Sequence, residues 1–356
     1  MTGAMPTAGT ATMGADLAFV AGRLRPHLAD MLAAEQAEWK EYGAPWWDVP
    51  QELAGYLDGG KALRPRFCYW GHAIGARRPG PLLLRGCAAL ELLHAFALIH
   101  DDLMDCSAVR RGAPSLHRQL AAEHRLHRWA GDPDAYGEAV ALLTGDFALA
   151  LASRLAATFP ARARLVWARL VGELTAGQFL DLAGAARRDR SAEVARTTAV
   201  LKSGRYTVTG PLRLGAALSG EAELPVGVAR YGDLVGEAFQ LRDDLLGVFG
   251  DPRRTGKPVG EDLRAGKPTL LLAYAAAMLP PAVQPVLSRV GSPALTGDDA
   301  AELTEALAAC GIRDRVERRI AGNIRAACAA VRQAAPPARV REALCDLAVA
   351  AAIRQG

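Results

Sequence analysis

The apolar residues of this sequence are spaced as they are in helices, and almost nowhere as they are in strands. Alanine and leucine dominate the chain, aromatic residues make up only 6% of it, and alternating runs of β-branched residues are nearly absent. The sequence therefore predicts an all-α fold. Neither an internal repeat nor a low-complexity linker divides the chain, so we expect one domain. A single domain of this length needs a central feature around which its helices pack.

Helices are expected where runs of helix-forming residues are bounded by capping residues, proline or glycine. They cover residues 17–42, 50–57, 64–74, 82–105, 136–159, 161–182, 192–207, 208–218, 225–249, 269–278, 298–310, 313–334 and 337–353. Polar or Pro- and Gly-rich segments predict loops at residues 123–134, 250–267 and 280–299. Residues 1–14 lack a basic start and a continuous apolar run, so they predict a flexible tail and not a signal peptide. The folded domain is then expected over residues 15–356.

Charge and cysteine usage narrow the class of protein. The 42 basic and 38 acidic residues give a net charge of +4, which is too small to predict nucleic acid as a partner. The cysteines form no C-x-x-C pair and lie in apolar stretches, which favours buried free thiols in the cytoplasm over disulfides. They are Cys68, Cys87, Cys106, Cys310, Cys328 and Cys345. The longest apolar runs, residues 82–99 and 270–279, are interrupted by polar residues or too short, so no membrane segment is expected.

A first acidic motif, D-D-L-M-D at residues 101–105, stands at the end of one of the most apolar expected helices. At about 100° per residue, Asp101 and Asp105 lie one turn apart on the same face. Such carboxylates repel unless a cation lies between them, and oxygen ligands with room for water suit Mg²⁺. A solvated acidic helix end is the alternative interpretation. Burying these carboxylates without a metal would be costly, however, so the motif favours a magnesium site.

A second acidic pair, Asp243 and Asp244, ends another apolar stretch far along the chain. Two acidic helix faces can oppose each other across a cavity, where carboxylates from both sides would hold a diphosphate through several Mg²⁺ ions. Cations accompany the acidic motifs or stand beside glycines, at Lys61, Arg64, Arg110, Arg111, Lys202, Lys257 and Lys267. Glycine permits close approach to phosphate oxygens, and arginine binds them with two hydrogen bonds. The combination predicts a phosphorylated small molecule as substrate.

These motifs resemble, in order and spacing, those of the trans-type isoprenyl diphosphate synthases, or polyprenyl synthetases. The resemblance extends from residue 53 to residue 272. Its motifs are G-G-K-x-L-R-P at 59–65, E-L-x-H-x-x-x-x-x-D-D-x-x-D at 91–105, R-R-G-x-P at 110–114, G-D at 145–146, G-Q at 177–178, K-S at 202–203 and F-Q-x-x-D-D at 239–244, followed by G-K at 256–257 and 266–267. Any one of them alone would be weak, but the ordered set is specific.

The resemblance implies head-to-tail prenyl transfer between isopentenyl diphosphate and an allylic prenyl diphosphate, on an all-helical fold with a central tunnel. It implies a cytoplasmic homodimer, with residues 15–356 as the catalytic domain and three Mg²⁺ ions in each active site. The implied metal ligands are Asp101, Asp105 and Asp243, supported by Asp102 and Asp244. The implied allylic diphosphate contacts are Arg110, Lys202 and Lys257, with Ser203, Gln240 and Lys267 as further substrate contacts. The implied isopentenyl diphosphate contacts are Lys61, Arg64, His94 and Arg111.

The remaining histidines are not expected to take part in the reaction. A hydrogen-bonded core histidine is the alternative interpretation of His94 itself. We expect structural roles for His100 and His117, and solvated side chains for His124 and His127. No zinc site is expected.

The second acidic motif departs from the form that many members of the family carry. Gly247 stands where the last aspartate of D-D-x-x-D would be, and Asp251 follows between Gly250 and Pro252, where the helix is expected to end. This form resembles that of bacterial geranylgeranyl diphosphate synthases. We expect the missing carboxylate to be dispensable, so that Gly247→Asp changes the rate only modestly.

Two other functions share parts of this pattern. A class I terpene cyclase would need the first acidic motif but not a second diphosphate site, so Lys61, Arg64 and Arg111 argue against it. A non-catalytic subunit of a heteromeric prenyl synthase would have lost its ligands, so the intact first motif argues against that function.

The length of the product is expected to depend on residues one turn before the first acidic motif. An aromatic residue five positions before that motif and a small one four positions before it resemble the pattern of family members that make a twenty-carbon product. Here these residues are Phe96 and Ala97. We therefore predict geranylgeranyl diphosphate, with farnesyl diphosphate or a longer product as the alternative, and a core role as the alternative for Phe96.

Overall fold

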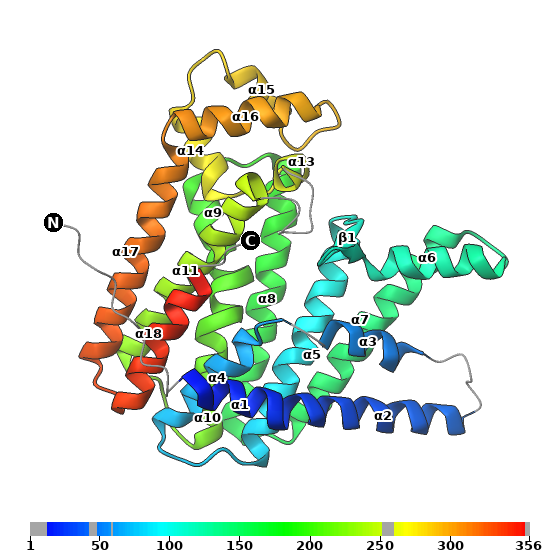
Figure 1. Cartoon of the computed structure of the whole chain (residues 1–356), viewed down its shortest axis with the longest axis vertical. Coiled ribbons are helices and arrows are strands. Elements are labelled where there is room, and N and C mark those ends of the chain that lie inside the picture. Colours follow the sequence, from blue (N-terminus) through cyan, green and yellow to red (C-terminus); the bar gives the residue numbers. More distant parts are fainter. Residues whose placement is uncertain (1–12, 43–47, 58–59, 251–259, 353–356) are drawn as a thin grey trace.

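The computed structural model describes residues 13–42, 48–57, 60–250 and 260–352 of the chain (Figure 1). Across these residues the structure is helical except for one short hairpin, which confirms the all-α fold. In chain order the elements are α1 (Met13–Phe19), the π-helix η1 (Val20–Leu24), α2 (Arg25–Glu41), α3 (Val49–Leu57), α4 (Leu63–Ile74), α5 (Pro81–Met104), β1 (Val109–Arg110), β2 (Ala113–Pro114), α6 (Leu116–His127), α7 (Pro133–Ala157), α8 (Ala161–Arg187), α9 (Ala192–Thr198), the π-helix η2 (Ala199–Thr209), α10 (Gly210–Ser219), α11 (Val226–Phe249), α13 (Glu261–Ala265), α14 (Leu270–Met278), α15 (Gln284–Arg289), α16 (Gly297–Ala309), α17 (Ile312–Gln333) and α18 (Ala338–Ala352).

Local sequence explains where several of the helices begin. The side chain of Asp132 accepts hydrogen bonds from the backbone N–H groups of Asp134 and Ala135, and Pro133 occupies the first position of α7. At the start of α16, Thr296 and Asp299 form a capping box, in which each side chain accepts a hydrogen bond from the other residue's backbone N–H. These bonds satisfy N–H groups that the first helical turn leaves without partners.

The helices pack mostly as neighbouring pairs around the long central helices. Helix α5 packs against α7, α4 against α10, and α11 against both α17 and η2. Figure 1 shows α1 and α2 running across one end of the molecule and α15 and α16 across the other, with α17 along one side. Glycines bring α4 and α10 into backbone contact, because a Cβ at Gly71 would lie only 2.9 Å from Cα of Leu212.

The buried apolar side chains form three clusters. One joins α5, α7 and α8 with the N-terminal helices, a second joins the end of α11 to α14, α16 and α17, and a third lies between α4, α11, α17 and α18. In the third cluster, the fully buried Tyr231 donates a hydrogen bond from its hydroxyl to the carbonyl oxygen of Leu344, at 2.6 Å. Its hydroxyl is therefore satisfied without water.

Several expected boundaries are wrong. The loop expected over residues 123–134 is partly helical, since α6 buries Leu116, Leu120 and His124 along one face. Short helices α13 and α15 lie within the other two expected loops, and α1 begins at Met13, inside the expected tail. The hairpin of β1 and β2 was not expected. Its two-residue connection, Arg111 and Gly112, has φ values of 54° and 80°, the left-handed conformations that a tight type I′ turn requires.

The cysteine and membrane expectations hold only in part. All the cysteines are free thiols, and Cys68 and Cys87 are buried as expected, but Cys106 is exposed and the others are half-buried. Two helices are long and apolar enough to cross a membrane by length and composition, α5 and α7. In the most apolar window of each, 56% of α5 but only 39% of α7 is buried inside the molecule, so α5 is more like a core helix than α7. The search of the sequence for long apolar runs considered residues 82–99 and 270–279 and did not single out α7.

Candidate active site

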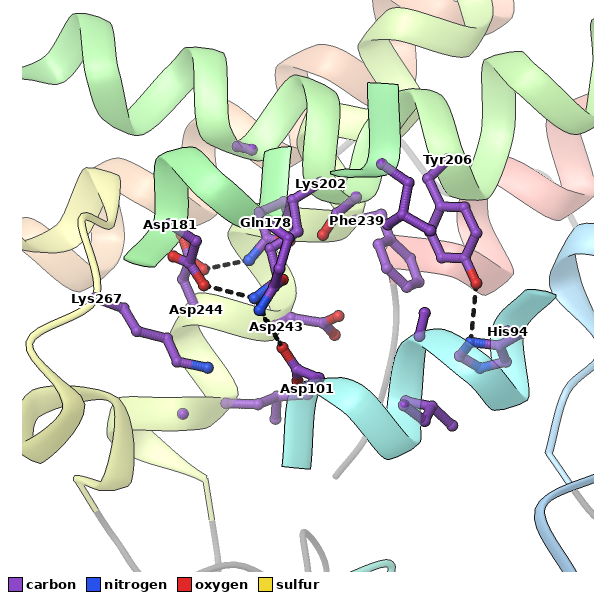
Figure 2. Close-up of a pocket in the computed structure, with 18 of the residues that line it drawn as sticks. His94, Asp101, Gln178, Asp181, Lys202, Tyr206, Phe239, Asp243, Asp244 and Lys267 are labelled. Carbon is purple, nitrogen blue, oxygen red and sulfur yellow. Dashed lines mark hydrogen bonds and ion pairs between the residues drawn. The ribbon is translucent and has the colours of Figure 1, made fainter. Parts of the chain in front are cut away.

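A cavity of about 600 Å³ lies between α5, α8, η2 and α11, and residues in and directly after α13 line it as well (Figure 2). It is lined by most of the residues that the motifs single out. These are Lys61, Arg64, His94, Ala97, Asp101, Arg110, Arg111, Lys202, Ser203, Gln240, Asp243, Asp244 and Lys267. Phe96, Asp102 and Asp105 are not among its lining residues, and Lys257 lies outside the described residues. The cavity thus brings together motifs that lie as far apart in the chain as those of Lys61 and Lys267.

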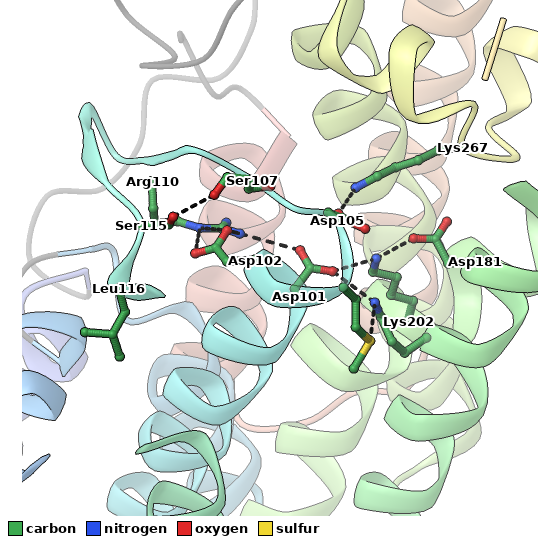
Figure 3. Close-up of polar contacts among 12 residues, drawn as sticks. Asp101, Asp102, Asp105, Ser107, Arg110, Ser115, Leu116, Asp181, Lys202 and Lys267 are labelled. Carbon is green, nitrogen blue, oxygen red and sulfur yellow. Dashed lines mark hydrogen bonds and ion pairs between the residues drawn. The ribbon is translucent and has the colours of Figure 1, made fainter. Parts of the chain in front are cut away.

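Asp101, in the last turn of α5, is surrounded by cations (Figure 3). Its carboxylate lies 3.0 Å from Nζ of Lys202 and 3.5 Å from a guanidinium nitrogen of Arg110. Burial by itself would raise the pKa of the Asp101 carboxyl, but the charges of Lys202, Lys267 and Arg110 outweigh it and hold that pKa well below its usual range. Asp101 is therefore ionised at neutral pH and already faces positive charge.

Asp102 binds Arg110 and so holds the hairpin that carries it. Nε of Arg110 lies 3.0 Å from both of its carboxylate oxygens, and Nη2 of the same arginine donates to it as well. The Asp102 side chain is buried, so this pair is shielded from water and fixes Arg110 beside Asp101. Asp102 thus holds Arg110 in place, and its supporting role in metal binding stays a prediction.

Asp105 follows the last residue of α5 and contacts the far end of the site. Its carboxylate lies 2.7 Å from Nζ of Lys267. Burial would lower the pKa of Lys267, but the carboxylates of Asp262, Asp101 and Asp105 outweigh it and raise that pKa. Lys267 is therefore a half-buried, fully charged ammonium between the two acidic motifs.

Lys202 is held by Asp181, a residue that the motifs did not identify. The Lys202 ammonium forms a second ion pair, at 2.5 Å, with Asp181 of α8, and Gln178 of the G-Q motif donates a hydrogen bond to Asp101 at 3.2 Å. Gly177 allows this approach, since a Cβ there would lie 2.6 Å from Cα of Lys202. The spacing G-Q-x-x-D, three residues from Gln178 to Asp181 on one helix face, is the signal that could have identified Asp181. Lys202 itself lies in η2, and π-helical turns are frequent at functional sites.

The two carboxylates of the second acidic pair, Asp243 and Asp244, differ in burial. Asp244 is buried and accepts a hydrogen bond from Nε2 of Gln240 at 2.6 Å. Burial, together with the charges of Asp262 and Asp243, raises the pKa of the Asp244 carboxyl well above its usual range, against the effect of that hydrogen bond. Asp243 is half-buried and lines the cavity from α11, the helix that lies across the cavity from Asp101 in Figure 2.

The basic end of the cavity is built around Tyr206. Its ring lies under the guanidinium of Arg64, 4.2 Å from the ring centroid, and its hydroxyl lies 3.2 Å from Nδ1 of His94. Arg64 also donates to Oγ1 of Thr207 at 3.1 Å. Glu91 lines the same cavity, and burial raises the pKa of its carboxyl despite the nearby charges of Arg64 and Arg111. Tyr206 was not expected, although it stands one turn after Lys202 in η2.

The remaining expectations concern residues on either side of the cavity. Ala97 lines it, whereas the ring of Phe96 packs 4.5 Å from that of His100 and belongs to the core around α5. His117 is buried, in agreement with a structural role, and His127 is exposed. The expectation that His124 is solvated is wrong, because it is buried against Trp129 and Tyr136 and lies 3.1 Å from the carbonyl oxygen of Ala130.

The donor set fits a metal ion that binds together with a phosphorylated ligand. Among the described residues, no three His, Cys, Asp or Glu side chains are close enough to hold a metal ion by themselves. Mg²⁺ commonly takes one or two carboxylates and completes its octahedron with waters and phosphate oxygens. Asp101 and Asp243 line the same cavity, and Asp105 stands one turn from Asp101. The oxygen donors and the adjoining cations thus suit Mg²⁺ with a diphosphate.

Comparison with known proteins agrees with this architecture. The family model for polyprenyl synthetases matches residues 50–307. A nonaprenyl diphosphate synthase of Mycobacterium tuberculosis is 31% identical over 306 residues, which are 85% of this chain and 85% of that protein. A (2E,6E)-farnesyl diphosphate synthase of Mycobacterium bovis is 32% identical over 266 residues, 72% of this chain and 66% of that protein.

Solved structures of other proteins share this fold. The crystal structure of a geranylgeranyl pyrophosphate synthase from Corynebacterium glutamicum, complexed with isoprenyl diphosphate and magnesium, is 34% identical and superposes with a TM-score of 0.88. The match covers 95% of this chain and 99% of that one. The motifs, the cavity that unites them and these similarities lead to one conclusion: the chain belongs to the polyprenyl synthetase family and is a trans-prenyl diphosphate synthase.

Proposed function

We propose that the protein condenses isopentenyl diphosphate with an allylic diphosphate, head to tail, and that its product is geranylgeranyl diphosphate. The observation that carries the proposal is the division of one cavity into two ends. Asp101, Lys202 and Asp243 lie at one end, and His94 and Tyr206 lie at the other, where Arg64 contacts the Tyr206 ring. One end suits an ionising allylic diphosphate and the other a second diphosphate that must not ionise.

The allylic diphosphate would occupy the acidic end. Its carbon–oxygen bond breaks, and the electron pair leaves with the diphosphate. Bound Mg²⁺, held by Asp101, Asp105 and Asp243, supplies positive charge that stabilises this leaving group. Lys202, Arg110 and Lys267 already stand at this end, fixed by Asp181, Asp102 and Asp105 respectively, so they need little rearrangement to bind the developing charge.

Isopentenyl diphosphate would occupy the basic end, bound by Lys61, Arg64 and Arg111, with His94 beside them. The double bond of isopentenyl diphosphate attacks the allylic cation and forms the new carbon–carbon bond. A proton is then lost from the adjacent carbon, and the released diphosphate is its acceptor. The chemistry needs no nucleophilic side chain, and this agrees with a cavity lined by carboxylates and cations.

A twenty-carbon product is proposed from the residues before the first acidic motif. Ala97 leaves space on the cavity side of α5, and Phe96 packs behind it. The similar structure with the TM-score of 0.88 is a geranylgeranyl pyrophosphate synthase, whereas related sequences make nonaprenyl and farnesyl diphosphates. The family alone therefore leaves the length open, and the proposal depends on these two residues.

The proposal extends to the setting of the enzyme. We infer a cytoplasmic homodimer with three Mg²⁺ ions in each active site, as the resemblance implies. The support for a dimer in this chain is α7, which exposes Leu142 and Leu143 although it is apolar enough to lie in a core.

The test is an assay of the purified protein with isopentenyl diphosphate and five-, ten- or fifteen-carbon allylic primers, with and without Mg²⁺. We expect Mg²⁺-dependent release of diphosphate and products that stop at twenty carbons. Cyclic hydrocarbons formed without consumption of isopentenyl diphosphate would identify a terpene cyclase instead. No product from any primer, by a protein that still binds diphosphate, would indicate a non-catalytic subunit.

A further inference from the structure

An arginine that is not among the lining residues of the cavity holds the turn that carries Lys267. Nη1 of Arg190 donates a hydrogen bond to the carbonyl oxygen of Gly266 at 3.2 Å, and Nη2 donates one to the carbonyl oxygen of Val290 at 3.3 Å. Gly266 immediately precedes Lys267 in the chain. Arg190 is half-buried and lies in the link between α8 and α9. Its planar guanidinium therefore connects two backbone segments that lie far from it in the chain.

The two segments that Arg190 joins are in direct backbone contact. A Cβ at Gly266 would lie 2.6 Å from Cα of Gly291, which follows Val290. The N–H of Gly291 also donates to the carbonyl oxygen of Leu263 in α13, at 3.1 Å. Gly266 and Gly291 have φ values of 66° and 77°, in the left-handed region that favours glycine. Arg190 therefore binds where the two segments touch.

The link that carries Arg190 is itself fixed by side chains on both sides of it. Oδ1 of Asp189 accepts a hydrogen bond from the N–H of Ser191 at 2.7 Å, and Oγ of Ser191 accepts one from the N–H of Val194 at 3.2 Å. Burial, together with the charge of Arg188, lowers the pKa of the Arg190 guanidinium despite the nearby carboxylate of Asp189. The surroundings thus disfavour its positive charge, and the hydrogen bonds to the two carbonyl oxygens offset part of that cost.

Helix α8 thereby supports both lysines of the acidic end of the cavity. Asp181 of α8 pairs with Lys202 at 2.5 Å. Gly184 of the same helix packs against Pro268, since a Cβ there would lie 2.7 Å from Cγ of that proline. Pro268 directly follows Lys267, and Figure 3 shows the ammonium groups of both lysines pointing toward the end of α5. Helix α8 and the link after it therefore determine where the two lysines stand relative to each other.

On this basis, and resting on the proposed function, we propose that Arg190 is a positioning residue for prenyl transfer. It anchors the turn at residues 266–268 to the end of α8 and so holds the ammonium of Lys267 in place for the leaving diphosphate. A lysine side chain is long and flexible, and α13 before it spans only Glu261–Ala265, too few residues to be stable alone. The anchored Lys267 binds the developing charge without prior rearrangement. Arg190 itself contacts neither substrate nor metal.

The test measures the affinity of the whole protein for inorganic diphosphate by calorimetry at saturating Mg²⁺, together with the kinetics of prenyl transfer. We expect Arg190→Gln to weaken diphosphate binding by about tenfold, as for the loss of a hydrogen bond to a charged group. It should also lower kcat by at least about tenfold, with little change in the KM for isopentenyl diphosphate, which occupies the other end of the cavity. Arg187→Gln is the matched control, because it removes the same charge from the exposed end of α8, and both quantities should stay unchanged.

The decisive comparison uses Lys267→Ala as the background. Because Arg190 acts through Lys267, adding Arg190→Gln to Lys267→Ala should weaken diphosphate binding by less than about twofold further. Losses that simply multiply would overturn the proposal, since they are expected of a general structural defect.

A second variant separates the hydrogen bonds of Arg190 from its charge. Arg190→Lys keeps the charge but loses the planar fork that binds both carbonyl oxygens, so it should recover only part of the affinity and of kcat. Full recovery in this variant would show that the charge alone matters, and the proposal would be wrong. These outcomes leave the proposed function standing, which fails instead if the unmodified protein forms no prenyl product.

Discussion

Asp101 is half-buried and yet firmly ionised. Its carboxylate is held in that state by Lys202, Lys267 and Arg110, so it is available to a divalent cation at neutral pH. Asp101 and Asp105 would hold the metal ion, and the ammonium groups of Lys202 and Lys267 that pair with them would bind phosphate oxygens. The ion pairs of Asp101 and Asp105 therefore keep the carboxylates and the cations of the site charged before a ligand binds.

Replacing Asp101 should remove transition-state stabilisation without unfolding the protein. We expect Asp101→Ala to lower kcat by at least about 10³-fold, because the loss affects the charge that develops on the leaving diphosphate. Lys202 keeps its ion pair with Asp181, so the melting temperature should change little. Steady-state kinetics and thermal unfolding followed by circular dichroism provide the two measurements. Near-normal turnover at saturating Mg²⁺ would contradict the assignment.

At the basic end, Lys61→Ala should mainly weaken the binding of isopentenyl diphosphate. Loss of a hydrogen bond to a charged group costs about 1.5–3 kcal/mol, so the KM for this substrate should rise by at least about tenfold with a smaller change in kcat. Lys40→Ala, at an exposed lysine of α2 outside the cavity, is the control. If only the KM of the allylic substrate rises, the two ends of the cavity have been assigned in reverse.

The sequence predicts single site residues better than their partners. Motifs identified Asp101, Lys202 and Asp243 because charged residues in apolar helices are costly unless they have a function. Asp181 and Tyr206 were missed, since each acts through a residue far away in the chain, and only the packing of α8, η2 and α5 brings them together. The close approach of Asp262 to Gly247, where a Cβ would lie 2.6 Å from Cγ of Asp262, could not be predicted either. A glycine in the sequence does not show which side chain packs against it.

At the scale of whole elements, helices with strong apolar patterns were predictable and their termini and short neighbours were not. Helix α6 was missed because its apolar residues, Leu116 and Leu120, are few and stand among charged ones. Its stability comes from packing on α7, which no local pattern encodes. The hairpin before it depends on two residues with positive φ, of which only Gly112 is a recognisable turn residue.

The contact between α4 and α10 should be highly sensitive to side-chain volume. Gly71→Ala would place a methyl group 2.9 Å from Cα of Leu212 and force the helices apart, so we expect the free energy of unfolding to fall by about 1–3 kcal/mol. Gly322→Ala, in open space on α17, should instead be neutral or stabilise by up to about 1 kcal/mol. Urea unfolding of both variants would measure the difference. Equal stabilities would show that α4 and α10 adapt without strain.

Helix α5 should also determine product length in steps of one turn. A helical turn rises about 5.4 Å, comparable to one five-carbon unit, and Ala97 stands one turn before Asp101 on the cavity side. Ala97→Phe should shorten the product toward fifteen carbons. Phe96→Ala should lengthen it if the growing chain reaches past α5 into the core where Phe96 packs. Chromatography of the dephosphorylated products gives the lengths. Active variants that both make the wild-type product would assign the stop to another helix.

At the scale of the whole molecule, the structure of a single chain does not explain why α7 exposes so many apolar residues. Its most apolar stretch has the hydropathy of a membrane span, but only 39% of that stretch is buried, whereas the corresponding stretch of α5 is 56% buried. Large exposed apolar side chains lie on α7 and on α8. They are Leu142, Leu143, Leu165, Phe179 and Leu182. Exposed apolar surface of this kind commonly marks a protein interface, which is the basis for the proposed homodimer.

A charge placed on this surface should separate the two subunits. The unmodified protein is expected to sediment with a mass close to twice 37.6 kDa. Leu143 is 58% exposed in the single chain, so Leu143→Glu should fold normally but bury an unpaired carboxylate in the dimer. At a cost of about 3 kcal/mol or more, the dimer should dissociate at least about 100-fold more readily. Val226→Glu, at an apolar residue of α11 that is 87% exposed, provides the control and should leave the mass unchanged. Analytical ultracentrifugation over a range of concentrations measures both variants. If the unmodified protein is a monomer at micromolar concentration, or if Leu143→Glu remains dimeric, α7 does not form the interface, and the exposed leucines need another explanation.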